Sequence, residues 1–355
     1  MQKKLIALAV AGLASTAAFA QTNVTVYGVM DATFDYVGAS QSTAATKVKN
    51  DSRVSANSSY LGFKGVEDLG NGLKAVFQIE GGLTNDAAGA WGGANRDTYV
   101  GLTGGFGTVV AGNLTAAGRA LGAKVDVNSG ATGIGYQGAL YGKVAGTTSG
   151  VDDRTANAVA YISPNFSGFS ALAAWGAGSE QKDTATRTDN VWSLGLNYAA
   201  GPVYAGYAYT QVDNVVGTIE AKAKSHRLGG TFNFGAGQVG LLWDRTDANT
   251  SDSTDSARNV WLLNGKFNVG AKGAVIAGYG KAGDVGNVNN TGATHAFVGY
   301  EHSLSKRTVL KAIYAQVRNE AGASYNFYNA ATGSVAGVVA GNDPKGFQFG
   351  IRHSF

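Results

Sequence analysis

Three segments of the chain have the glycine spacing G-x-G-x-x-G, which can wrap a phosphate group in nucleotide-binding proteins. They cover residues 133–138, 235–240 and 278–283. In a nucleotide site this loop joins a strand to a helix, and an acidic residue follows about 20 positions later. None of the three segments combines these features, and with 53 glycines in 355 residues chance matches are expected. The spacing therefore does not predict nucleotide binding.

Other side chains that could do chemistry are equally scattered. The chain has no cysteine, which excludes disulfides and thiol catalysis. Serines are abundant, but no motif marks one as a nucleophile with a histidine and an orienting polar group. We therefore expect no enzyme, no cofactor and no metal. The four histidines, none paired at metal-ligand spacing, are His226, His295, His302 and His353.

One acidic stretch could bind a hard cation through oxygen ligands. Residues 247–255 read DANTSDSTD, and carboxylate and hydroxyl oxygens suit calcium. The stretch lacks the central glycine and the terminal glutamate of an EF-hand loop. We interpret it as a solvated loop.

The last strand of the chain alternates strictly between two kinds of side chain. Phe347, Phe349, Ile351, His353 and Phe355 fall on one face, while small or polar residues fall on the other. A strand of this kind can separate lipid from water; the alternative is an edge strand of a soluble sandwich. The terminal Phe355 resembles the signal by which outer-membrane β-barrels are recognised for assembly.

The first twenty residues predict export. Lys3 and Lys4 precede the apolar run 5–13, and Ala18-Phe19-Ala20 supplies small residues before a cleavage point. We expect a signal peptide at 1–20 and one transmembrane β-barrel domain at 21–355, because no later run reaches the roughly 20 apolar residues of a spanning helix. Without the signal peptide, 26 basic residues balance 24 acidic ones. That balance does not predict nucleic-acid binding.

Alternation bounded by turn residues predicts sixteen strands. Short connections such as 104–107 alternate with long ones such as 37–52, 116–153, 178–189 and 319–344, an asymmetry typical of membrane barrels. In one strand Val260 and Leu262 put apolar groups on the face that should be polar. The predicted strands are 23–36, 53–66, 73–83, 95–104, 108–115, 154–163, 168–177, 190–199, 202–212, 225–234, 238–247, 258–268, 273–282, 293–303, 307–318 and 345–355.

The run 61–80 (LGFKGVEDLGNGLKAVFQIE) resembles the second strand, first periplasmic turn and third strand of the general diffusion porins of β-proteobacteria. The resemblance spans the whole mature chain. It implies an all-β fold, a transmembrane antiparallel β-barrel of 16 strands, with the long third loop, 116–153, folded into the lumen. The further matching segments are 24–28 (VTVYG), 100–102 (VGL), 105–107 (GFG), 161–164 (YISP), 304–308 (LSKRT) and 352–355 (RHSF).

Two positions depart from this family pattern. Tyr60 and Asn113 stand where relatives carry arginine, whereas Arg96 and Arg154 match positions of a basic pore wall. We therefore expect weak to moderate anion preference. The candidates for the pore constriction are Tyr60, Lys64, Lys74, Arg96, Asp126, Asp152, Asp153 and Arg154, with Arg352, Asp31 and Glu80 as further wall residues.

The resemblance implies an outer-membrane channel for passive diffusion of small hydrophilic solutes and ions. It also implies a homotrimer, contact with outer-membrane lipid and lipopolysaccharide, and the barrel-assembly machinery as a partner during biogenesis. The alternative is a substrate-specific channel with a saturable binding site in the lumen. An adhesin or receptor that works through the long loops would share the same barrel.

Overall fold

The structure is a computed structural model that describes residues 23–41, 47–86, 91–128, 133–145, 147–148, 150–177, 187–216, 219–249, 256–328 and 334–355. The predicted signal peptide lies outside these residues, as does most of the acidic stretch 247–255. Among the described residues, no helix is long and apolar enough to cross a membrane.

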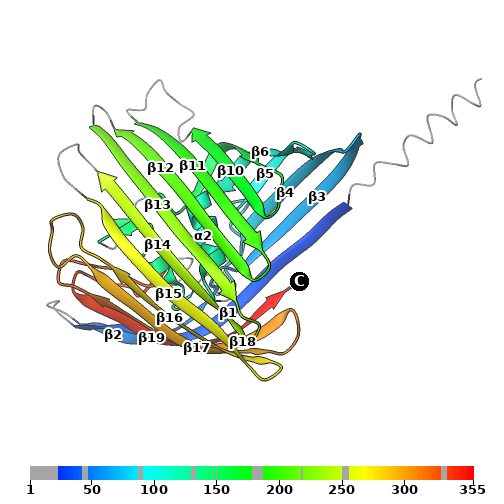
Figure 1. Ribbon diagram of the computed structural model, residues 1–355. Coiled ribbons are helices and arrows are strands. Elements are labelled where there is room, and N and C mark those ends of the chain that lie inside the picture. The colour runs from blue at the N-terminus through cyan, green and yellow to red at the C-terminus, as the bar shows by residue number, and fades with distance from the viewer. Residues whose placement is uncertain are drawn as a thin grey trace, which may run out of the picture.

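One antiparallel sheet holds seventeen of the described strands (Figure 1). A small hairpin of β7 (Lys143–Val144) and β8 (Thr147–Thr148), the helix α2 (Ala117–Val125) and the turn η1 (Gln137–Ala139) lie in the connection between β6 and β9. The strands of the large sheet are β1 (Asn23–Gln41), β2 (Val48–Ser55), β3 (Tyr60–Gly70), β4 (Leu73–Gly82), β5 (Thr98–Gly104), β6 (Gly107–Thr115), β9 (Arg154–Ile162), β10 (Phe169–Ala177), β11 (Arg187–Ala200), β12 (Val203–Val216), β13 (Ile219–Asn233), β14 (Gly237–Asn249), β15 (Arg258–Val269), β16 (Gly273–Ala282), β17 (Ala293–Ser303), β18 (Thr308–Asn319) and β19 (Asn342–Ser354).

The sheet closes on itself through β1. Along one edge β1 pairs with β19, from Val29 opposite Ser354 to Gln41 opposite Asn342. Along its other edge, β1 pairs with β3 through residues 23–29 and with β2 through residues 33–39. Because β2 and β3 are two parts of one barrel strand, the seventeen strands fill sixteen positions in the ring. The predicted closed barrel of sixteen strands is confirmed.

The predicted continuous strand 53–66 is wrong, because the chain leaves the ladder between β2 and β3. Asn57 has a φ of 45° there, in the left-handed region that asparagine tolerates. The Ser59 hydroxyl replaces the lost ladder contact: it accepts a bond of 2.8 Å from the Asp31 backbone N–H and donates one of 2.6 Å to the Ala56 carbonyl. A side chain thus satisfies the backbone at this break.

Several predicted connections are too long. β1 continues to Gln41, β2 begins at Val48, and β11 begins at Arg187, so the predicted loops 37–52 and 178–189 are partly strand. Likewise β12 ends at Val216 and β13 begins at Ile219. The reason is that ladder hydrogen bonds need only paired backbones. The strands therefore continue after the apolar alternation that identifies them has ended.

The outer face of the barrel is apolar and the inner face polar. In β19, Phe347 and Phe349 are 48% and 53% exposed, whereas Gln348 between them is fully buried. The two apolar residues that broke the alternation, Val260 and Leu262, point inward and are buried in a cluster with Leu140 of the β6–β9 connection. They are apolar because they pack against chain that lies inside the barrel.

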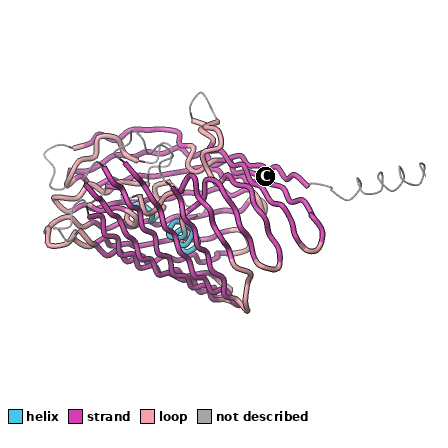
Figure 2. The backbone as a smooth tube through the Cα atoms, turned by 90° about the horizontal axis from the view of Figure 1, so that it is seen from above, coloured by secondary structure: helices cyan, strands magenta, loops and turns pink. Residues whose placement is uncertain are grey.

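The helix α2 lies against the inner face of β11 to β14, where Figure 2 shows it within the ring of strands. The wall has glycine residues at these contacts, where a side chain would collide with the helix. A Cβ on Gly206 would meet Leu121 Cδ1 at 2.8 Å, and a Cβ on Gly240 would meet the Val125 carbonyl at 2.6 Å. The buried helix residues Ala117, Leu121 and Val125 thus approach the wall closely.

The C-terminal residue completes the seam of the barrel. The Phe355 backbone N–H donates to the Gly28 carbonyl at 3.1 Å, and the Gly28 N–H donates to Phe355 at 3.3 Å. The Phe355 ring covers the space where a Gly28 side chain would stand. Phe355 therefore contributes both backbone pairing and an apolar group at the junction of the first and last strands.

Deleting Phe355 should lower the amount of folded barrel in the outer membrane severalfold, because the seam loses two hydrogen bonds and the terminal aromatic group. The amount of folded barrel would be measured in outer-membrane fractions by the change in electrophoretic mobility of the protein on heating. Phe349→Ala, at an outward position within the same strand, is the matched control and should have a smaller effect. Wild-type levels of folded protein without Phe355 would contradict the assembly role.

Candidate functional site

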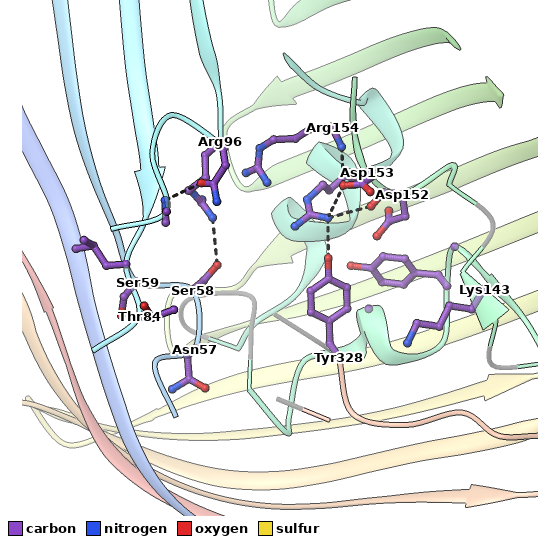
Figure 3. Close-up of a pocket in the computed structure, with 18 residues that line it drawn as sticks. Asn57, Ser58, Ser59, Thr84, Arg96, Lys143, Asp152, Asp153, Arg154 and Tyr328 are labelled. Atoms are coloured by element: carbon purple, nitrogen blue, oxygen red, sulfur yellow. Dashed lines mark hydrogen bonds and ion pairs between the residues drawn. The ribbon is translucent and has the colours of Figure 1, made fainter. Parts of the chain in front are cut away.

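A cavity of about 670 Å³ lies between one part of the barrel wall and the β6–β9 connection (Figure 3). Residues 57–59 and 82–84, together with Gly92, Asn95 and Arg96, form one side. The other side comes from the connection and from Tyr328 in the segment before β19. The charged residues that line the cavity are four cations and two acids: Arg96, Arg119, Lys143, Arg154, Asp152 and Asp153.

Arg96 is fixed to the wall by three neighbours. Its Nε donates to the Glu80 carboxylate of β4, and its Nη1 donates to the Ser58 hydroxyl at 3.4 Å. Its guanidinium lies 4.6 Å from the centre of the Tyr60 ring, within the range of a cation–π contact. Tyr60 itself is not among the lining residues, so it supports Arg96 from behind.

Asn113 has a similar supporting position. Its side-chain amide donates to the Arg96 carbonyl at 2.8 Å. Both positions at which the sequence departs from the arginine pattern therefore contact Arg96, one through the guanidinium and the other through the backbone.

Arg154, the first residue of β9, is held by Asp97. The Arg154 Nε lies 3.4 Å from Asp97 Oδ2, and the same carboxylate accepts bonds of 2.7 and 2.8 Å from the N–H and hydroxyl of Thr115. The contact uses only one of the guanidinium's nitrogen atoms. Arg96 and Arg154, both expected from the sequence, thus line the same cavity.

The two predicted acids have different surroundings. Asp152 is buried and lies 2.6 Å from Arg227 Nη1, whereas the Asp153 side chain is 67% exposed. Burial raises the pKa of Asp152, although Arg227 and Arg119 oppose the shift. The charge of Asp152 is therefore compensated by a neighbour, and Asp153 presents the exposed negative charge of the cavity.

A buried ion cluster anchors the connection to the wall. Arg227 of β13 lies 3.0 Å from Asp244 of β14, and Arg258 of β15 lies 3.2 Å from the other oxygen of the same carboxylate. These arginines also donate to backbone carbonyls of the connection, Arg227 to Gly118 at 2.5 Å and Arg258 to Leu140 at 3.0 Å. The cluster holds the lining residues in place.

Three predicted site residues lie elsewhere. Lys64 and Lys74 line a separate groove of about 480 Å³ with Asn23 and Thr25, and the Lys64 ammonium lies 4.9 Å from the centre of the Tyr27 ring. Asp126 follows α2 and accepts bonds from the N–H groups of Asn128 and Gln137 at 2.8 and 3.0 Å. Burial raises the pKa of Asp126 to about 7. None of the three lines the larger cavity.

Sequence reasoning missed Arg119, Lys143 and Tyr328 as lining residues, and it missed Arg227 and Arg258 as anchors. Arg119 and Lys143 lie within the long connection, whose cations were a signal that we did not use. Arg227 and Asp244 are buried at inward positions of the neighbouring strands β13 and β14, and opposite charges at such positions are a stronger signal for buried pairing. Tyr328 has no distinguishing sequence context.

The barrel and its charged interior cavity define a membrane channel, and comparisons with known proteins agree. The chain belongs to the Gram-negative porin family, whose model matches residues 7–322. Outer membrane porin protein 32 of Delftia acidovorans is 34% identical over 364 residues, which cover all of both chains. Major outer membrane protein P.IB of Neisseria gonorrhoeae is 31% identical and covers 87% of this chain and 91% of its own.

Solved structures show the same fold. The anion-selective porin from Comamonas acidovorans matches with a TM-score of 0.77 at 29% identity, over 94% of this chain and all of its own. OmpT of Vibrio cholerae in its trimer form matches with a TM-score of 0.67 at 16% identity, over 94% and 99% of the two chains. The chain is thus located in the Gram-negative outer membrane.

The lining residue Lys143 should make ion permeation depend on pH. Burial lowers its pKa to about 8, aided by Arg258 and opposed by Asp152. Below that pH Lys143 is charged, and above it the cavity loses one positive charge. The permeability of chloride relative to potassium should therefore fall between pH 7 and 9, as measured by reversal potentials in bilayers. Lys143→Gln should remove this part of the pH dependence, and an unchanged profile in that variant would refute the assignment.

Proposed function

We propose that this porin is a non-enzymatic channel for passive diffusion of small hydrophilic solutes and ions, with weak to moderate anion preference. The observation that carries the proposal is the composition of the cavity lining, in which four cations outnumber the two acids Asp152 and Asp153. Partners outside the lining compensate Arg96, Arg154 and Asp152, namely Glu80, Asp97 and Arg227. A permeating anion is attracted there and a cation repelled.

The mechanism combines size with electrostatics. The connection 116–153 occupies part of the lumen and so sets the width of the path, and the anchored guanidinium groups set its field. Charges in a constriction shielded from bulk water outweigh charges on the rim, because the effective dielectric constant is lower there. The preference should weaken as salt rises, since mobile ions screen these charges.

A substrate-specific channel is the alternative within the same fold. Arg96 uses its Nε and Nη1, and Arg154 uses its Nε, in the bonds described above. Both guanidinium groups therefore retain nitrogen donors for a bound anion. Solute flux that saturates with concentration would favour this alternative, whereas flux that stays proportional to concentration favours free diffusion.

Replacing Arg154 should shift the reversal potential toward cation preference. Arg154→Ala removes a fixed charge from the cavity and should lower the chloride-to-potassium permeability ratio by about twofold at low salt. The matched control is Lys272→Ala, which removes the same charge from an exposed turn between β15 and β16. If both variants behave alike, or if the wild type already prefers cations at low salt, the proposed basic wall is wrong.

We also propose that the channel is a homotrimer, supported by the trimer form of a structural relative. A homotrimer should have three times the mass of the mature chain, which is the 36.2 kDa chain without its signal peptide, and bound detergent adds to this mass. Light scattering of the protein in mild detergent would measure this mass. A fully conducting monomer would contradict the proposal. Contact with lipopolysaccharide and with the barrel-assembly machinery remains a prediction from the sequence.

A further inference from the structure

Arg119 reaches the cavity from the β6–β9 connection (the lumen segment, residues 116–153) and not from the barrel wall. It lies in the first turn of α2, on the side of the helix opposite the residues that pack against the wall, and its side chain is 19% exposed. Its Nη1 donates to the Asp152 carbonyl at 2.9 Å and to the Tyr328 hydroxyl at 2.6 Å. Among the described residues, every bond to its guanidinium uses Nη1, so Nε and Nη2 keep their donors for a passing anion.

Tyr328 comes from a different part of the chain, the long connection between β18 and β19. Its ring packs edge-on against Tyr136 at a centroid distance of 4.9 Å. The same connection is tied to the lumen segment by a bond of 3.1 Å from the Ser324 N–H to the Ala145 carbonyl. The Tyr328 hydroxyl is therefore held in a defined place, and it orients the Arg119 guanidinium.

The charge of Arg119 is secure in this setting. Burial alone would lower its pKa, but Tyr328 and Asp152, with smaller contributions from Tyr136 and Asp153, raise it above its ordinary value. Burial raises the pKa of Tyr328, so its hydroxyl stays protonated and neutral at physiological pH. The pair thus presents one permanent positive charge to the cavity.

We propose that Arg119 is a selectivity-determining residue of this channel and that Tyr328 is its positioning residue, so that the β18–β19 connection adjusts ion preference through one hydrogen bond. The proposal rests on the proposed channel function. It assigns part of the selectivity to the β6–β9 connection, whereas Arg96 and Arg154 belong to the wall.

Reversal potentials in a potassium chloride gradient would test the role of Arg119. Arg119→Gln should lower the chloride-to-potassium permeability ratio by about twofold. The matched control is Lys124→Gln, the same loss of charge on the exposed side of the same helix, where the ammonium lies 5.7 Å from the centre of the Tyr204 ring. Equal shifts in both variants would overturn the assignment of Arg119.

A double-mutant cycle would test the role of Tyr328. Tyr328→Phe keeps the ring against Tyr136 and removes only the hydroxyl, so it should lower the permeability ratio by less than Arg119→Gln. In the Arg119→Gln background it should have no further effect. An equal effect in both backgrounds would show that Tyr328 acts independently of Arg119 and would overturn its positioning role.

If Arg119→Gln fails to fold, the Tyr328→Phe variant at wild-type yield still decides, since an unchanged permeability ratio overturns the proposal. Each shift is measured against the wild type. A wild type that prefers cations would refute the proposed anion preference. The role of Arg119 is tested separately, by the change in permeability ratio between the wild type and Arg119→Gln.

Discussion

A backbone that crosses a bilayer finds no water with which to pair its N–H and C=O groups, and each unpaired group costs several kcal/mol. This constraint explains why β1 has partners along both edges and why the last residue bonds to Gly28. It also explains the treatment of the break between β2 and β3, where the Ser59 hydroxyl takes the place of a ladder partner. Within the closed ring, α2 of the long β6–β9 connection packs against the inner face of β11 to β14.

Charged groups inside the barrel are paired in a buried cluster. Asp244 accepts bonds from Arg227 and Arg258, which in turn bind carbonyls of the connection. Removing one partner of such a buried cluster typically costs about 3–5 kcal/mol, because a charge is left uncompensated. The cluster therefore does more than join three strands. It fixes the position of the segment that carries Arg119, Lys143 and the two acids of the cavity.

The charge balance of the cavity differs from that of the whole chain. The chain without its predicted signal peptide is nearly neutral, yet the cavity collects four cations against Asp152, which Arg227 compensates, and Asp153, which is exposed. Tyr60 and Asn113, at positions where the resemblance led us to expect arginine, hold Arg96 instead. Of the four cations, Arg119 lies on the opposite side of the cavity from Arg96. Counting charges over the whole sequence would miss this arrangement.

The sequence by itself determined the barrel, its sixteen strands and the apolar outer face, since period-two alternation and short turns are local patterns that the chain repeats. The family resemblance also named Arg96 and Arg154, which the fold places in the lining of one cavity. Tertiary structure decided the rest. The strands extend beyond their alternation because backbone pairing does not depend on side chains. Lys64 and Lys74 lie away from the cavity because a residue's depth in the barrel depends on strand stagger, and Asp126 does so because it bonds to the backbone of Asn128 and Gln137 within the connection. Arg119 meets Tyr328, which lies 209 positions later in the chain, only after the ring has closed. No local pattern encodes that contact, because the geometry of the closed barrel brings the two residues together.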